Sequence, residues 1–133
     1  MMLDLHTHTE RYSPCSMISL DELILAEQEY VDGIVVTDHD HLMKEDVAEK
    51  LSSKYGYLIF PGSEISAKGV YAHILAFGIE REIGPDLGVK ETIAKIHEQN
   101  GIAVAAHPFR YINEFDKNEW KGLDAIETLT PNC

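Results

Sequence analysis

The chain has 133 residues, of which 44% are hydrophobic, and it carries a formal net charge of −12 at pH 7. This length suits one domain or part of one, and the hydrophobic content is ordinary for a globular protein and argues against a disordered chain. The acidic balance argues against a basic nucleic-acid-binding surface, because such binding depends on Lys and Arg side chains that neutralise phosphates.

Short apolar runs alternate with amphipathic stretches along the chain. This pattern predicts repeating strand and helix units around a sheet of mostly parallel strands, an α/β fold. We expect strands at Met2–His6, Gly33–Asp38, Tyr57–Glu64, Val70–Phe77, Ile102–His107 and Leu123–Thr128.

Helices are predicted between these strands from the spacing of apolar residues. Ser19 and Glu22 have the spacing of a capping box, and Gly33 is expected to stop the first helix. We expect helices at Ser19–Asp32, Met43–Lys54 and Leu87–Gln99, and a loop with a short helix at Tyr111–Lys121.

The start of the chain and its cysteines bear on the compartment. Met1–His8 does not resemble a signal peptide, and no apolar run approaches the ~20 residues of a membrane helix. Cys15 and Cys133 are separated by nearly the whole chain, so a disulfide framework is not indicated. We therefore expect a soluble, cytoplasmic protein with no membrane partner.

Polar side chains suited to chemistry gather at the C-terminal ends of the predicted strands. In parallel α/β architectures, active sites are built at that edge of the sheet. Alternation along a strand sends His6 and His8 to one face, where two imidazoles can share a cation. Taken alone, this spacing fits a pair of solvated histidines equally well.

Further strand ends carry similar residues. A polar turn after a strand would explain the aspartates of Asp38-His39-Asp40-His41 better than its histidines. Glu64 alone fits a surface acid or a helix start, but its two carboxylate oxygens can also bridge two cations.

The remaining histidines are ambiguous one by one. His73, in an apolar strand, fits a hydrogen-bonded core residue, and His97 fits a surface residue on a polar helix face. His107 ends a strand before Pro108. Taken together, the strand ends favour metal binding, and mixed imidazole and carboxylate ligands suit Zn, Mn or Fe.

The order of the segments DLHTHT, TDHD, GSE, AHILAFG, AAHP and GLDAIE resembles the PHP family, named for polymerase and histidinol phosphatase, along essentially the whole chain. The resemblance implies a distorted (β/α)7 TIM-like barrel with two or three divalent metal ions at its C-terminal mouth. It also implies hydrolysis of phosphomonoesters or phosphodiesters by a water activated between the metals.

The resemblance assigns roles to individual residues. His6 and His8 look like ligands of the first metal, and Glu64 looks like the carboxylate that bridges two metals. His73 and His107 are similar to ligands of the second metal.

His39 resembles a ligand of a third metal. With Asp38 orienting it, His39 is also a candidate acid for the leaving group. Arg110 and Arg11 are candidate phosphate clamps, because a guanidinium group binds phosphate oxygens in a fork; both also fit surface charges.

The sequence departs from the family pattern at two places. Ser13 stands where many members carry an aspartate, and no histidine follows His107, where members carry a final Asp-x-His strand. We therefore expect 1–133 to be a single PHP-like domain that lacks its C-terminal part: a piece of a longer chain, or a chain completed by a partner. The open sheet edges also make a homo-oligomer an expectation.

The expected substrate is a small phosphorylated molecule such as a nucleotide, histidinol phosphate or an oligonucleotide end. Two alternatives belong to other classes of protein. One is a metal-binding but catalytically inactive structural or regulatory module, and the other is a metal-free scaffold.

Overall fold

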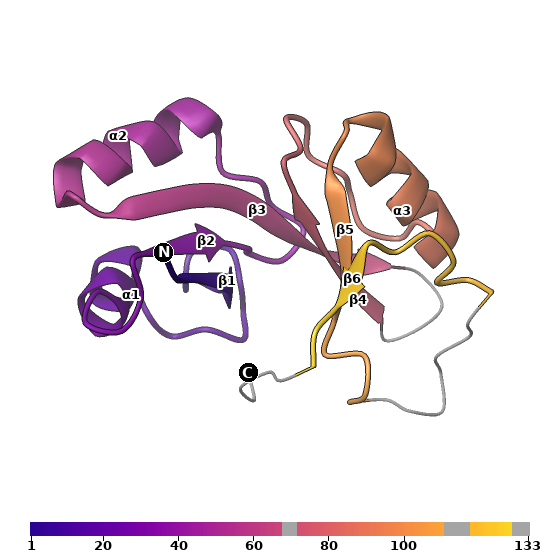
Figure 1. Ribbon diagram of the computed structural model, residues 1–133, viewed down its shortest axis with the longest axis horizontal. Helices are drawn as coiled ribbons and strands as arrows, with labels where there is room; N and C mark the ends of the chain where they lie inside the picture. The colour runs from indigo at the N-terminus through magenta and orange to yellow at the C-terminus, as the bar shows by residue number, and fades with distance from the viewer. Residues whose placement is uncertain (68–71, 111–117, 129–133) are drawn as a thin grey trace.

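The computed structural model describes residues 1–67, 72–110 and 118–128 (Figure 1). In these ranges the elements are β1 Leu3–Thr7, α1 Leu20–Glu27, β2 Gly33–Val36, α2 Glu45–Tyr55, β3 Leu58–Ala67, β4 Ala72–Phe77, α3 Val89–Glu98, β5 Ile102–Ala106 and β6 Ala125–Ile126. No helix there is long and apolar enough to cross a membrane. The expected start of a strand at Val70, most of the expected loop at Tyr111–Lys121, and Cys133 lie outside the described residues.

The strands form one curled sheet in chain order, β1-β2-β3-β4-β5-β6. β1 pairs with β2, β2 with β3, and β5 with β6 in parallel, whereas β4 is antiparallel to both β3 and β5. The fold is a mixed α/β half barrel. The expectation of mostly parallel strands is therefore wrong.

The reversal at β4 follows from the length of its connection. β3 ends at Ala67 and β4 begins at Ala72, so only residues 68–71 join them. A parallel pairing requires a crossover of a dozen or more residues, which this segment cannot supply. Because β4 runs backwards, its first residues lie beside the last residues of β5, and His73 is paired in register with Ala106.

β3 joins two halves of the molecule. Its first part, to Pro61, pairs with β2, and its second part, from Gly62, pairs with β4. In Figure 1, α2 lies along β3, and α3 lies beside β5 in the other half. One hydrophobic cluster contains Leu23, Ile24, Ile34, Val36 and Ile59, and the other contains Ile65, Ile74, Ile93, Ile96 and Ala103 among its members.

The first helix is shorter than the sequence predicts. The capping box of Ser19 and Glu22 is confirmed, but α1 ends at Glu27. The backbone N–H of Asp32 donates to the oxygen of Met2 at 2.7 Å, so the chain has already joined the sheet there. Gly33 does not stop the helix. It opens β2, where an added Cβ would lie 2.5 Å from Cβ of Leu58.

The glycine at the junction of β3 offers a test of this packing. A Cβ on Gly62 would lie 2.9 Å from Val35 Cγ1 and 3.0 Å from Thr37 Cγ2. Gly62→Ala should therefore lower the free energy of unfolding by about 1–3 kcal/mol, as overpacking does. The matched control is Gly84→Ala, because a Cβ there meets nothing within 4 Å. Equal stability of the two variants in urea unfolding would contradict the packing.

Candidate metal centre

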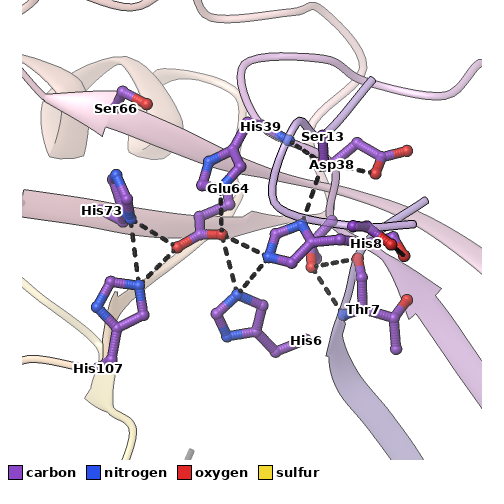
Figure 2. A network of polar contacts seen from close by, with 12 residues as sticks. His6, Thr7, His8, Ser13, Asp38, His39, Glu64, Ser66, His73 and His107 are labelled. Atoms are coloured by element: carbon purple, nitrogen blue, oxygen red, sulfur yellow. Dashed lines mark hydrogen bonds and ion pairs between the residues drawn. The ribbon is translucent and has the colours of Figure 1, made fainter. Parts of the chain in front are cut away.

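The centre is built around the carboxylate of Glu64, which lies in the middle of β3 and is 1% exposed. Figure 2 shows this carboxylate between two groups of histidine side chains, one facing each oxygen. The histidines come from strands in both halves of the sheet. The curl of the sheet brings the ends of these strands together around Glu64.

Three imidazoles face Oε2 of Glu64. The Nε2 atoms of His8, His6 and His39 lie 2.8 Å, 3.0 Å and 3.5 Å from this oxygen. His6 and His8 also approach each other, with 3.1 Å between their Nε2 atoms. The expectation that both side chains lie on one face of the first strand is confirmed.

Two further imidazoles face Oε1 of Glu64. Nδ1 of His73 and Nε2 of His107 each lie 2.9 Å from this oxygen, and they lie 3.1 Å from each other. His73 reaches the site from the start of β4 and His107 from the end of β5, because the two strands are antiparallel. The structure thus brings together all six residues that the sequence offered as metal ligands.

Thr7, the residue between His6 and His8, explains why their side chains point the same way. Thr7 points away from the carboxylate, and its hydroxyl donates to the oxygen of Val35 at 2.8 Å. Its backbone N–H donates to Thr37 Oγ1 at 3.1 Å. These buried contacts fix β1 against β2, so that the neighbouring imidazoles face Glu64.

Asp38 anchors the loop that follows β1. Its carboxylate accepts from the backbone N–H and the hydroxyl of Thr9 at 2.6 Å and 2.7 Å, and from Ser13 Oγ at 2.8 Å. Ser13 Oγ in turn lies 3.2 Å from Nδ1 of His8 and accepts from the backbone N–H of His39 at 3.0 Å. Ser13 therefore connects Asp38 to two candidate ligands.

The expected orienting contact between Asp38 and the His39 ring is not what the structure shows. Asp38 reaches His39 only through Ser13 and the backbone, because its carboxylate is occupied by Thr9 and Ser13. Among the described residues, the buried Nδ1 of His39 has no hydrogen-bond partner. The His39 ring stacks instead on that of His8, with 4.7 Å between ring centroids.

Sequence reasoning missed two acids that hold the site together. Asp40, with φ 52°, accepts from the backbone N–H and the hydroxyl of Ser66 at 2.7 Å and 2.9 Å, which fixes the segment after β2 against β3. Glu127, just after β6, contacts Nδ1 of His6 at 2.8 Å. The available signal for Glu127 was its place at the end of a predicted strand, where the other site residues occur.

The buried charges shift the pKa of several groups. Burial alone would raise the pKa of Glu64, but hydrogen bonds from histidines, led by His107 and His6, outweigh it and hold that pKa far below the usual range. Burial likewise opposes protonation of His6, but hydrogen bonds with Glu127 and Glu64 raise its pKa to about 10. Burial lowers the pKa of His39, which favours the neutral imidazole that binds metals.

The spacing of these donor atoms fits divalent metal ions. Two ligand atoms that each lie about 2.0–2.2 Å from one tetrahedral zinc ion are separated by roughly 3.3–3.6 Å. The nitrogen pairs at 3.1 Å, and their distances to Glu64 near 3 Å, are a few tenths of an ångström shorter than this separation. Groups of side chains in the described ranges that could hold a metal ion are His6, His8 and Glu64; His39, Glu64 and His73; and His8, Cys15 and His39.

The two arginines lie in different places. Arg110 lines a cavity of about 230 Å³ together with His6, His8 and His107. Arg11 instead lies 5.4 Å from the ring centroid of Tyr12 and lines another cavity. Arg110 is thus next to candidate ligands, whereas the cavity that Arg11 lines includes none of the six candidate ligands.

Comparisons with known proteins place the chain among relatives. No family model matches it. Its fold is similar to the crystal structure of a protein from Bifidobacterium adolescentis, provisionally described as a metal-dependent phosphoesterase, with a TM-score of 0.74, 17% identity, and coverage of 94% of this chain and 76% of that one. An uncharacterized protein of Methanocaldococcus jannaschii, MJ1587, is 31% identical over 120 residues, which cover 82% of this chain and 68% of that protein. The chain belongs to the same family as MJ1587.

Proposed function

We propose that this chain is a metal-dependent phosphoesterase of the PHP type, which hydrolyses phosphate monoesters or diesters with two or three divalent cations. The observation that carries the proposal is the arrangement of Glu64, with one group of imidazoles on each carboxylate oxygen. A carboxylate that faces two groups of nitrogen ligands is suited to bridging two cations.

The fold supports the same proposal. The similar structure from Bifidobacterium adolescentis is provisionally described as a metal-dependent phosphoesterase, and the likeness covers 94% of this chain. The order of the motifs resembles the PHP family independently of that likeness. Zn, Mn and Fe remain the proposed metals, because imidazole and carboxylate ligands suit all three.

Divalent cations, when bound, would offset charge on phosphoryl oxygens and lower the pKa of a water molecule. The chain itself would supply orientation. Arg110 would bind a phosphate oxygen at the cavity beside His6 and His107, and His39 is proposed as a ligand or as the leaving-group acid. A cavity of about 230 Å³ favours a small phosphorylated group, such as that of a nucleotide, histidinol phosphate or an oligonucleotide end.

Metal content is the first test of this proposal. The wild-type protein, purified without a chelator or a metal column, should contain about two divalent ions, because each oxygen of Glu64 faces its own ligand group. The double variant His6→Ala/His8→Ala should lose at least one ion and melt at a lower temperature in excess metal. The control is His41→Ala/His97→Ala, which removes two histidines outside the Glu64 cluster. Equal metal content in the two double variants, by elemental analysis, would contradict the assignment.

The bridging role of Glu64 has its own test. Glu64→Gln keeps the shape of the side chain but removes the charge shared by the two ligand groups, so Mn-stimulated hydrolysis of an aryl phosphate should fall to the level of the metal-free protein. The control is Glu91→Gln, on the exposed face of α3. Far-UV circular dichroism checks that both variants are folded. Retained activity in Glu64→Gln would refute the bridge, and metal retention without turnover in the wild type would favour an inactive metal-binding module.

Arg110 should bind substrate because it lies in the cavity beside the histidines. Arg110→Ala should lower kcat/KM for a phosphomonoester by about 10–100-fold, the range for losing a charge-assisted hydrogen bond. Arg11→Ala should have a smaller effect, because Arg11 lies over Tyr12. Arg81→Ala, at an exposed position, is the control. Steady-state kinetics in which Arg110→Ala matches Arg81→Ala would exclude this role.

A further inference from the structure

Glu127 contacts one candidate ligand on each side of Glu64. Its Oε1 lies 2.8 Å from Nδ1 of His6, and its Oε2 accepts the backbone N–H of His107 at 2.7 Å. The Glu127 side chain is 14% exposed. His6 belongs to the group on Oε2 of Glu64, and His107 belongs to the group on Oε1. The carboxylate of Glu127 therefore contacts one member of each of the two histidine groups around Glu64.

The contact with His6 determines which of its ring nitrogens can bind a metal. A carboxylate only accepts hydrogen bonds, so Nδ1 of His6 must carry a hydrogen where it faces Glu127. Nε2 of His6 lies 3.0 Å from Oε2 of Glu64, so in the metal-free protein this nitrogen carries a hydrogen as well. A cation that binds beside Glu64 and His8, whose Nε2 lies 3.1 Å away, would displace the Nε2 hydrogen, and Glu127 would keep the other hydrogen on Nδ1.

The contact with His107 acts on the backbone. His107 has φ 32°, a left-handed conformation that is uncommon for residues other than glycine. Glu127 accepts the N–H of this residue, while the His107 ring places Nε2 2.9 Å from Oε1 of Glu64. The hydrogen bond stabilises the bent backbone that turns the imidazole toward the centre.

We propose that Glu127 is a positioning residue that sets the tautomer of His6 and the backbone of His107, so that one ligand on each oxygen of Glu64 is ready for a cation. The inference rests on the proposed function, because it requires that these histidines bind metal. Partners that orient the ligating histidines in this way influence metal affinity strongly in other proteins.

A glutamine at this position would satisfy only one of the two contacts. Its side chain has one oxygen and one NH2 group, whereas Glu127 now faces two hydrogens. The N–H of His107 can only donate, so the oxygen should pair with it and leave the NH2 group facing His6. His6 would then accept at Nδ1 and carry its hydrogen on Nε2, the atom that must bind the metal. A change in the tautomer of His6 costs less free energy than leaving the backbone N–H of His107 opposite the NH2 group of the glutamine.

A packing role and a tautomer-setting role of Glu127 predict opposite orders of metal affinity in two variants. If Glu127 only packed β6 against its neighbours, Glu127→Gln, which has the same shape, would be milder than Glu127→Ala. If Glu127 sets the tautomer, Glu127→Gln should bind metal more weakly than Glu127→Ala, because water can accept both hydrogens in the alanine variant.

The experiment measures zinc affinity by competition with a chromophoric chelator, and the hydrogens on the two His6 ring nitrogens from ¹⁵N shifts before and after zinc is added. We expect Glu127→Gln to weaken zinc binding by about 10–100-fold and, in the zinc-free protein, to leave the hydrogen of His6 on Nε2 alone, whereas the wild type carries one on Nδ1. Asp124→Asn is the matched control. Asp124, immediately before β6, likewise accepts from a backbone N–H of β5, that of Ala103 at 2.8 Å, and contacts an imidazole, that of His97 at 2.9 Å, but away from the centre. It should leave zinc affinity unchanged.

The outcomes distinguish the role of Glu127 from the proposed function of the whole centre. A wild-type protein that binds no zinc would overturn both this inference and the proposed function. Zinc binding by the wild type with equal affinity in Glu127→Gln, or with a smaller loss in Glu127→Gln than in Glu127→Ala, would overturn the role of Glu127 alone.

Discussion

The buried negative charge of Glu64 constrains the rest of this structure. A carboxylate that is removed from water is stable only when it is paired and hydrogen-bonded on both oxygens. Here the imidazoles of His6, His8, His73 and His107 meet that requirement, and that of His39 lies 3.5 Å away. The five rings come from the ends of β1 and β5, the segment after β2, and the start of β4. A flat sheet could not bring these positions to one side chain in its middle strand. The curl of the sheet therefore brings the histidines to the charge of Glu64, and their contacts with that charge in turn stabilise the curl.

Acidic side chains repeatedly hold backbone groups of a neighbouring segment. Asp38 accepts the N–H of Thr9, Asp40 that of Ser66, and Glu127 that of His107. Each of these hydrogen bonds joins segments that are distant in sequence and lie around Glu64. Part of the net charge of −12 thus has a structural use near the candidate centre. It does not simply cover the surface.

The sequence predicted the existence of every element and the gathering of the histidines, because both depend on local pattern. Alternation in β1 was sufficient to place His6 and His8 together, and the position of Glu64 after a strand pattern led to the right carboxylate. The antiparallel direction of β4 was missed. The short segment between the two predicted strands could have indicated it, because so short a connection excludes a parallel pairing. The partners of Asp38 and Glu127 could not be predicted, because hydrogen bonds between side chains so far apart leave no periodic trace. The roles of these residues in metal binding stay predictions.

The contact between His6 and Glu127 spans 121 positions of the chain. Loop closure over such a distance carries an entropic cost, and non-local contacts of this kind slow folding. Synthesis proceeds from the N-terminus, so β1 and β2 leave the ribosome well before the strand that carries Glu127. Until that strand arrives, the imidazole of His6 lacks the partner that it has in the folded protein. The centre is therefore completed only after nearly all of the described chain has been made.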